Sequence, residues 1–131
     1  MTTRVLVLPL LAHVAWVTML YVALTVVRAP SVWGIGLRAD GSNPWSRYEP
    51  RISANLRNQF EWPVLFYTVS LLLLLEPTRI HPSQVWLAWV FVVGRVLHSG
   101  VQILTANIRL RGIVFTINFL AVLGMWGLLL T

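Results

Sequence analysis

The sequence contains no cysteine and no lysine, and only four of its residues are acidic. Without cysteine, the chain can form neither disulfides nor thiolate metal sites, and it has no thiol nucleophile of its own. Charged residues make up 11% of its 131 residues and hydrophobic ones 57%, whereas soluble domains carry about 25% charge. We therefore expect a single all-α membrane domain over residues 1–131, since this length leaves no room for a second domain.

All ten basic residues are arginines, and they give the chain a net charge of +6. In a membrane protein, such an excess more often reflects topology than nucleic-acid binding, so no nucleic-acid partner is expected, and no metal cofactor either. Arginine presents a planar fork of donors that suits carboxylates and phosphates. An anionic ligand and a bias in codon usage explain the absence of lysine equally well.

Four stretches are apolar enough for transmembrane helices. Residues 5–27 are longer than the hydrophobic part of a signal peptide and can cross a hydrocarbon core of about 30 Å. Residues 28–50 contain three prolines and three glycines and are expected to form a polar loop. The sequence thus predicts a bundle of four transmembrane helices, at about residues 5–27, 51–75, 83–105 and 111–130.

The second of these helices begins with polar residues, and only residues 62–75 are strictly apolar. That part is too short to cross a membrane alone. We therefore expect the polar part to continue the helix into the membrane, with its charged side chains turned away from lipid.

Arginines near the helix ends predict the orientation. One side of the membrane would hold six of them and the other side Arg4 and Arg79. By the positive-inside rule, the loop 28–50 is expected in the cytoplasm, and both termini on the other side. The six are Arg28, Arg38, Arg47, Arg51, Arg109 and Arg111.

Polar residues recur at helical spacing, so each of three helices carries a polar stripe. The stripes are Arg51, Asn55, Asn58 and Glu61, then Arg95, His98 and Gln102, then Arg111, Phe115 and Asn118. In one interpretation the stripes hold the helices together, and Arg57 neutralises Glu61. In the other, four buried arginines outnumber the one buried acid, and an anionic ligand neutralises the excess, which the arginine surplus favours.

The first apolar segment holds one histidine, His13. A lone histidine on an apolar helix is expected to make an interhelical hydrogen bond. The same segment has no acidic residue, which argues against a small four-helix multidrug exporter, because that function needs a membrane-embedded acid there.

Two motifs resemble a known family. Residues 55–66, Asn-Leu-Arg-Asn-Gln-Phe-Glu-Trp-Pro-Val-Leu-Phe, resemble the signature of the MAPEG proteins, the membrane-associated proteins of eicosanoid and glutathione metabolism. In that signature an Arg-Asn-x-x-Glu core precedes a proline and an apolar run. Residues 94–98, Gly-Arg-Val-Leu-His, resemble the family's Gly-Arg-x-x-His element. The chain looks like a short, bacterial-type member similar to the microsomal glutathione transferases.

The resemblance implies a homotrimer in a bacterial inner membrane, with a glutathione site between subunits that opens to the cytoplasm. Arg111 falls where the family places the arginine that faces the glutathione thiol. A neighbouring guanidinium favours the thiolate over a thiol whose ordinary pKa is about 8.5. Arg111 is therefore the expected catalytic residue. The expected cofactor-binding residues are Arg28, Arg51, Arg57, Asn58, Glu61, Arg95 and His98.

These observations leave two functions. The first is a glutathione transferase-like enzyme that joins a thiol cofactor to hydrophobic electrophiles from the bilayer, and Arg111, Asn58 and Glu61 favour it. The alternative is a non-catalytic protein of the same fold that binds lipid or a partner membrane complex. Gly112 and Phe115 favour this alternative, because they replace the Ser and Tyr that follow the arginine in prostaglandin E synthase.

Overall fold

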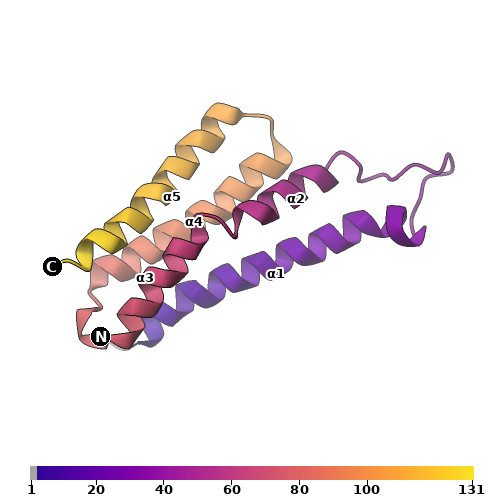
Figure 1. The fold of residues 1–131 in the computed structure, drawn as a ribbon. Coiled ribbons are helices and arrows are strands. Elements are labelled where there is room, and N and C mark those ends of the chain that lie inside the picture. Colours follow the sequence, from indigo (N-terminus) through magenta and orange to yellow (C-terminus); the bar gives the residue numbers. More distant parts are fainter. Residues whose placement is uncertain (1–2) are drawn as a thin grey trace.

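The computed structural model describes residues 3–131 of the chain, and within them every regular element is a helix (Figure 1). Three helices, α1, α4 and α5, are long and apolar enough to cross a membrane. The chain thus has the all-helical architecture that its composition predicts. The elements are α1 (Arg4–Trp33), α2 (Glu49–Asn58), α3 (Pro63–Leu75), the short 3-10 helix η1 (Pro77–Arg79), α4 (Pro82–Leu104) and α5 (Ile108–Leu128).

Helix α1 is longer than predicted, because it continues through Pro30 to Trp33. Proline lacks the N–H that would bond to the preceding turn, but its fixed φ is compatible with a helix. The helix ends at Gly34, whose φ of 69° suits glycine and whose N–H donates to Pro30 O at 3.0 Å. The loop between α1 and α2 therefore covers residues 34–48, and the prediction that it begins at residue 28 was wrong.

Hydrogen bonds attach this loop to α1 and stabilise a turn within it. The amide of Asn43 donates to Val27 O and to Ser31 Oγ, both at 2.9 Å, and so fastens the loop to the last turns of α1. Within the loop, Ser42 donates its N–H and its hydroxyl to Asp40, which lowers the pKa of that carboxyl.

The second membrane segment is broken, although the sequence analysis expected one helix over residues 51–75. Helix α2 ends at Asn58 and α3 begins at Pro63. Proline has no N–H to donate to the turn before it, while it suits the first position of a new helix. Trp62, the residue before Pro63, keeps helical backbone angles, with φ −60° and ψ −37°. Because of the break, the side chains of residues 59–62 can point in directions that a continuous helix would not allow.

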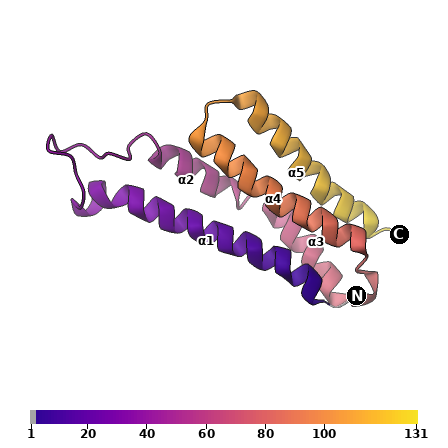
Figure 2. The same cartoon turned by 180° about the vertical axis from the view of Figure 1, so that it is seen from behind.

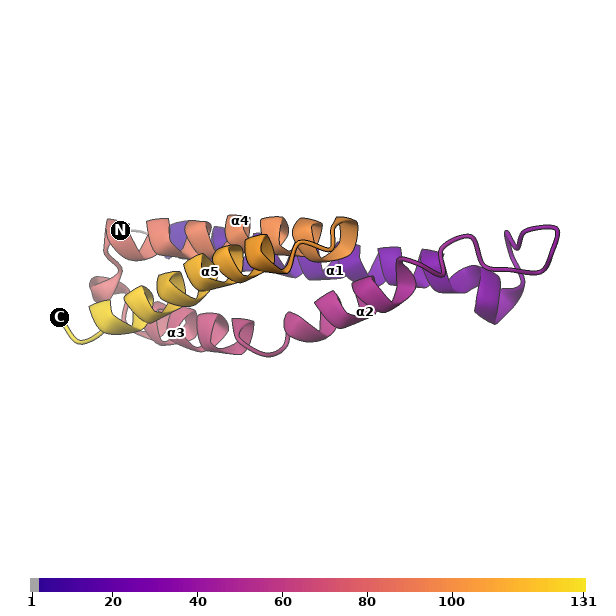
Figure 3. The same cartoon turned by 90° about the horizontal axis from the view of Figure 1, so that it is seen from above.

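The helices pack side by side, with α4 against α5, α1 and α2, and α3 against α1 and α5. Figures 2 and 3 show both ends of the chain at one end of the bundle and the loop 34–48 at the other. The turn between α4 and α5 lies toward the loop end. This arrangement agrees with the predicted grouping of the arginines into two sides.

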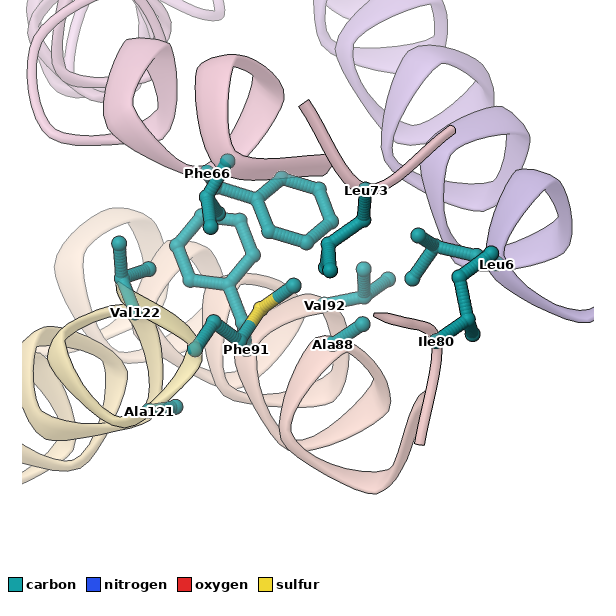
Figure 4. Close-up of a cluster of buried hydrophobic side chains, with 11 residues drawn as sticks. Leu6, Phe66, Leu73, Ile80, Ala88, Phe91, Val92, Ala121 and Val122 are labelled. Atoms are coloured by element: carbon teal, nitrogen blue, oxygen red, sulfur yellow. The ribbon is translucent and has the colours of Figure 1, made fainter. Parts of the chain in front are cut away.

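Two apolar clusters form the core. The first joins α1, α3, α4 and α5 around Phe66 and Phe91, whose rings stack with centroids 4.3 Å apart (Figure 4). The second joins α1 and α2 near the loop end. Its buried members are Leu20, Leu24, Val27, Ile52 and Leu56.

Candidate functional site

A layer of buried polar side chains separates the two apolar clusters, at the depth where the second segment breaks. Gln59, only 2% exposed, lies in this layer. Its Nε2 donates to Asn55 Oδ1 at 3.2 Å and to Ser99 Oγ at 3.3 Å. Its Oε1 accepts from Arg95 Nε at 3.3 Å. The break after α2 thus places an amide where it joins α2 to α4.

Further bonds join α2 to the second half of α4. Gln102 Oε1 accepts from Asn55 Nδ2 at 2.8 Å and from Asn58 Nδ2 at 3.2 Å. Arg51 Nη1 donates to the carbonyl oxygen of Ile103 at 3.2 Å. The amides of the stripes therefore do bond across helices, as the first interpretation of the stripes expects.

Beside this layer, three adjoining cavities form what we call the arginine groove, between α2, the second half of α4 and the first half of α5. Their volumes are about 280, 350 and 370 Å³. The first two share Asn58, His98 and Phe115, and the last two share Gln102, Ile108 and Arg111. Because each cavity shares lining residues with the next, the three can hold a single extended ligand.

Six of the eight predicted site residues line this groove, although they come from three separate stretches of sequence. The structure therefore brings most of the predicted set together in space. The six are Arg51, Asn58, Glu61, Arg95, His98 and Arg111.

The innermost cavity is lined by polar atoms without partners. Arg95 is only 1% exposed, yet its Nη2 has no hydrogen-bond partner among residues 3–131. The same holds, within these residues, for the buried atoms Trp62 Nε1 and His98 Nδ1. An unsatisfied buried polar atom costs about 1–3 kcal/mol. Such atoms around one cavity are the pattern expected where a polar ligand binds.

Arg111 lies in the first turn of α5. That helix is capped by Asn107, whose Oδ1 accepts from Leu110 N at 3.0 Å. The half-buried Arg111 side chain lines two of the three cavities. In the described part of the chain, its guanidinium makes no hydrogen bond or ion pair within the protomer, so its donors are available to an anion.

Two predicted ligand-binding arginines do not line the groove. Arg28 Nε donates to Glu49 Oε1 at 2.7 Å, and its Nη2 donates to Ser53 Oγ at 3.4 Å. These bonds join the end of α1 to the beginning of α2. Arg57 is exposed and lines none of the three cavities.

The predicted ion pair between Arg57 and Glu61 is absent from the ion pairs of residues 3–131, which are Arg28–Glu49 and Arg79–Glu76. The prediction assumed one continuous helix, whereas α2 ends between the two residues. Both side chains are exposed on the surface of the protomer. The expectation that the charges of this segment turn inward was therefore wrong for Arg57, whereas Glu61, although exposed, lines the innermost cavity of the groove.

The sequence analysis missed Gln59 and Ser99. Each stands four residues after a predicted stripe member, Asn55 or Arg95, so the spacing that defined the stripes would have found them.

The prediction that His13 makes an interhelical hydrogen bond is confirmed. Its Nε2 is 3.0 Å from Gln59 Oε1, and its Nδ1 is 2.6 Å from the hydroxyl oxygen of Tyr67.

Comparison with protein families decides what kind of protein this is. The model of the MAPEG family matches residues 6–131, nearly the whole chain. The protein belongs to the MAPEG family. This MAPEG protein is an integral membrane protein, in agreement with its three apolar helices. Its family includes both glutathione transferases and non-catalytic members. The comparisons with curated proteins and with solved structures find no match.

Proposed function

We propose that this MAPEG protein is a membrane glutathione transferase-like enzyme, which joins glutathione to hydrophobic electrophiles dissolved in the bilayer. The observation that carries the proposal is the arginine groove. It combines the unpaired Nη2 of buried Arg95 with the uncommitted guanidinium of Arg111.

The chemistry of the groove fits glutathione, which carries two carboxylates, one ammonium group and a thiol. Arg51, Arg95 and Arg111 supply cationic donors for the anionic groups, and the exposed Glu61 supplies an acceptor for the ammonium. Small-molecule sites in proteins usually measure about 300–1,000 Å³. Two of the three adjoining cavities, of about 350 and 370 Å³, fall in this range by themselves, and the third, of about 280 Å³, extends them.

The thiol, when bound, supplies a sulfur nucleophile that forms a bond to carbon while the leaving group departs with its electron pair. Arg111 would hold its guanidinium beside the sulfur and so favour the reactive thiolate. Ile108 and Phe115 line the same cavity and give it an apolar wall next to Arg111. A hydrophobic electrophile can lie against that wall.

A homotrimer is part of this proposal, and the exposed charges of α2 support it. Glu49 begins α2 and pairs with Arg28 near the end of α1. At 1.5 Å per residue, Arg57 lies about 12 Å further along the helix. A charged side chain exposed to hydrocarbon costs about 3 kcal/mol even on translocon-based scales. A neighbouring copy packed against the surface that carries Arg57 would shield its charge from hydrocarbon. Arg57 of one copy would then face Glu61 of the next.

We further propose that the loop 34–48 faces the cytoplasm of a bacterial inner membrane. The arginine count favours this side for the loop. The outermost cavity of the groove is lined by residues of the turn between α4 and α5, which lies toward the loop end of the bundle. Water-soluble glutathione would then enter from the cytoplasm.

Isothermal titration calorimetry of the purified protein in detergent tests the proposal. We expect saturable glutathione binding and a higher melting temperature at millimolar glutathione, because a ligand that binds only the folded state stabilises it by mass action. The variant Arg95→Gln should lose most of both effects, whereas Arg79→Gln, at the far end of the bundle, should keep them. An unchanged melting temperature together with no heat of binding would contradict the choice of glutathione.

The groove also supports a second candidate, a non-catalytic binder of lipid headgroups or of a partner membrane complex. The observation that favours it concerns the cavity of about 350 Å³ in the groove: none of its lining residues within 3–131 carries a hydroxyl group, and Gly112 and Phe115 form its wall beside Arg111. Glutathione binding without turnover of any electrophile would favour this candidate over the enzyme.

A further inference from the structure

A mostly apolar cavity, separate from the arginine groove, lies between α1 and the break between α2 and α3. We call it the lateral cavity, and its volume is about 350 Å³. Its walls are mostly apolar and include Val14, Val17, Phe60 and Val64. Among the described residues, it shares no lining side chain with the arginine groove. It is therefore a separate site within the protomer.

The floor of the lateral cavity is polar and built from buried groups. His13 is 0% exposed and Gln59 2% exposed, and both line the cavity together with Tyr67. His13 Nε2 lies 3.0 Å from Gln59 Oε1, and His13 Nδ1 lies 2.6 Å from the hydroxyl oxygen of Tyr67. A wholly apolar groove that only accommodates lipid tails would not need such a floor.

The hydrogen bonds that join Arg95, Gln59 and His13 determine which atom of each pair in the floor carries the proton. Arginine can only donate, so the Gln59 atom that faces Arg95 Nε must be the oxygen. His13 Nε2 must then carry the proton that it shares with Gln59. Burial without an anionic partner favours a neutral imidazole, so His13 Nδ1 is an acceptor. The hydroxyl of Tyr67 therefore donates to His13.

This assignment leaves the oxygen of Tyr67 with a free lone pair and no proton to give. Two other hydroxyl groups line the cavity. That of Thr18 already donates to Val14 O at 2.9 Å in its own helix, and Tyr21 stands about 12 Å further along α1 than His13, in the wall and away from the floor. The floor therefore offers an acceptor, which calls for a donor on the ligand.

The position of the cavity determines where its ligand comes from. His13 lies well inside the stretch of α1 between Arg4 and Arg28, which is about 36 Å long at 1.5 Å per residue. The side chains of Val14 and Tyr21 at the cavity are 48% and 49% exposed on the surface of the protomer. A ligand that enters there must be dissolved in the bilayer.

We propose that the lateral cavity binds an apolar, membrane-dissolved molecule that carries one hydroxyl group, such as an alkylphenol, whose O–H donates to the Tyr67 oxygen. The apolar part of the molecule fills the space between α1 and α3. This proposal does not depend on glutathione binding, because the two sites have separate linings.

Photolabelling of the intact protein in lipid vesicles tests the proposal. The probe is an alkylphenol with a diazirine on its alkyl chain, and the control is its methyl ether, which cannot donate. We expect the phenol to label the peptides around Val14 and Val64 about fivefold more strongly than the ether, the effect of one hydrogen bond away from water. An excess of the unmodified alkylphenol should suppress the labelling.

Two matched variants place the bond. Tyr67→Phe should remove the preference for the phenol, whereas Tyr21→Phe, in the wall of the same cavity, should keep it. Thermal melting shows whether each variant folds, and the comparison of phenol with ether in the unaltered protein needs no variant. Equal labelling by phenol and ether would mean that the cavity holds lipid chains only. An absence of labelling at these peptides would mean that another copy covers it, and either result overturns the proposal.

Discussion

Arg111 and Arg109 are neighbours in the first turn of α5 but differ in their surroundings. Arg111 is half-buried and lines the groove, whereas Arg109 is exposed and lines no part of the groove. If Arg111 stabilises a thiolate, its contribution should be greatest in the reacting state and small in the binding of glutathione. A large effect on turnover with a small effect on binding therefore distinguishes a catalytic arginine from one that only binds the ligand.

We therefore expect Arg111→Leu to lower turnover of a halogenated nitrobenzene by about 10- to 1,000-fold, the usual effect of removing one charge-stabilising donor. At a pH low enough to keep the bound thiol protonated, glutathione affinity should change little, and the apparent pKa of the bound thiol, followed by its ultraviolet absorbance, should rise. Arg109→Leu is the matched control and should leave both quantities unchanged. If the two variants had equal turnover, or the thiol pKa did not depend on Arg111, the assigned role would be wrong.

Residue by residue, the sequence predicted which side chains line the groove where helical spacing sufficed. Asn58, Arg95 and His98 line the groove because they share a face of helices that the structure contains. Arg28 and Arg57 do not line the groove of one protomer, because one pairs with Glu49 across two elements and the other faces outward; their ligand roles in a site between subunits stay a prediction. The spacing of residues along the sequence predicts neither the ion pair of Arg28 with Glu49 nor the outward position of Arg57.

At the scale of the elements, helices α4 and α5 approach each other closely at Gly94. A side-chain carbon at this position would overlap with Asn118 Oδ1 from α5. Asn118 is 0% exposed, so it has little room to move away. Gly94 precedes Arg95, and the close approach of the two helices therefore helps to hold one wall of the groove.

Gly94→Ala should destabilise the protein by about 1–3 kcal/mol, the usual cost of overpacking, measured as a lower melting temperature in detergent. Gly100→Ala is the control, because a carbon added there meets nothing within 4 Å; it should keep the melting temperature or raise it, since alanine favours helix. Combining Gly94→Ala with Asn118→Ala should recover part of the loss. Equal melting of the two single variants would show that α4 and α5 do not need this close approach.

The break between α2 and α3 shows why the helix boundaries were harder to predict than the helices. The sequence contains Pro30 and Pro63, each after polar residues, and the same rule about proline applies to both. Helix α1 continues through Pro30, whereas the second segment stops before Pro63. At the second segment, Gln59 follows the end of α2 and bonds to Asn55 and to Ser99 of α4, whereas α1 makes no comparable turn.

On the scale of the whole molecule, the charges that one protomer leaves exposed indicate how copies would assemble. Arg57 and Glu61 are exposed on the same broken segment and make no ion pair in the described part of the chain. A contact between this face and a different face of the next copy is heterologous, and such contacts generate a closed ring when the rotation from copy to copy closes. A ring of three would pair each Arg57 with a neighbouring Glu61 and keep both away from lipid.

The charge-reversal variants Arg57→Glu and Glu61→Arg should each weaken the trimer, because each places like charges opposite one another in a low-dielectric contact. We expect the concentration for half-dissociation to rise by roughly 10- to 100-fold in each, as measured by native mass spectrometry from detergent. The double variant restores opposite charges and should recover most of the assembly. Reversal of the exposed pair Arg79 and Glu76, which are bonded within one protomer at 2.6 Å, is the control and should leave assembly intact. A monomeric parent protein, or a double variant no better than the two single ones, would mean that these charges face something other than a second copy, and an anionic lipid at Arg57 would then be the next partner to test.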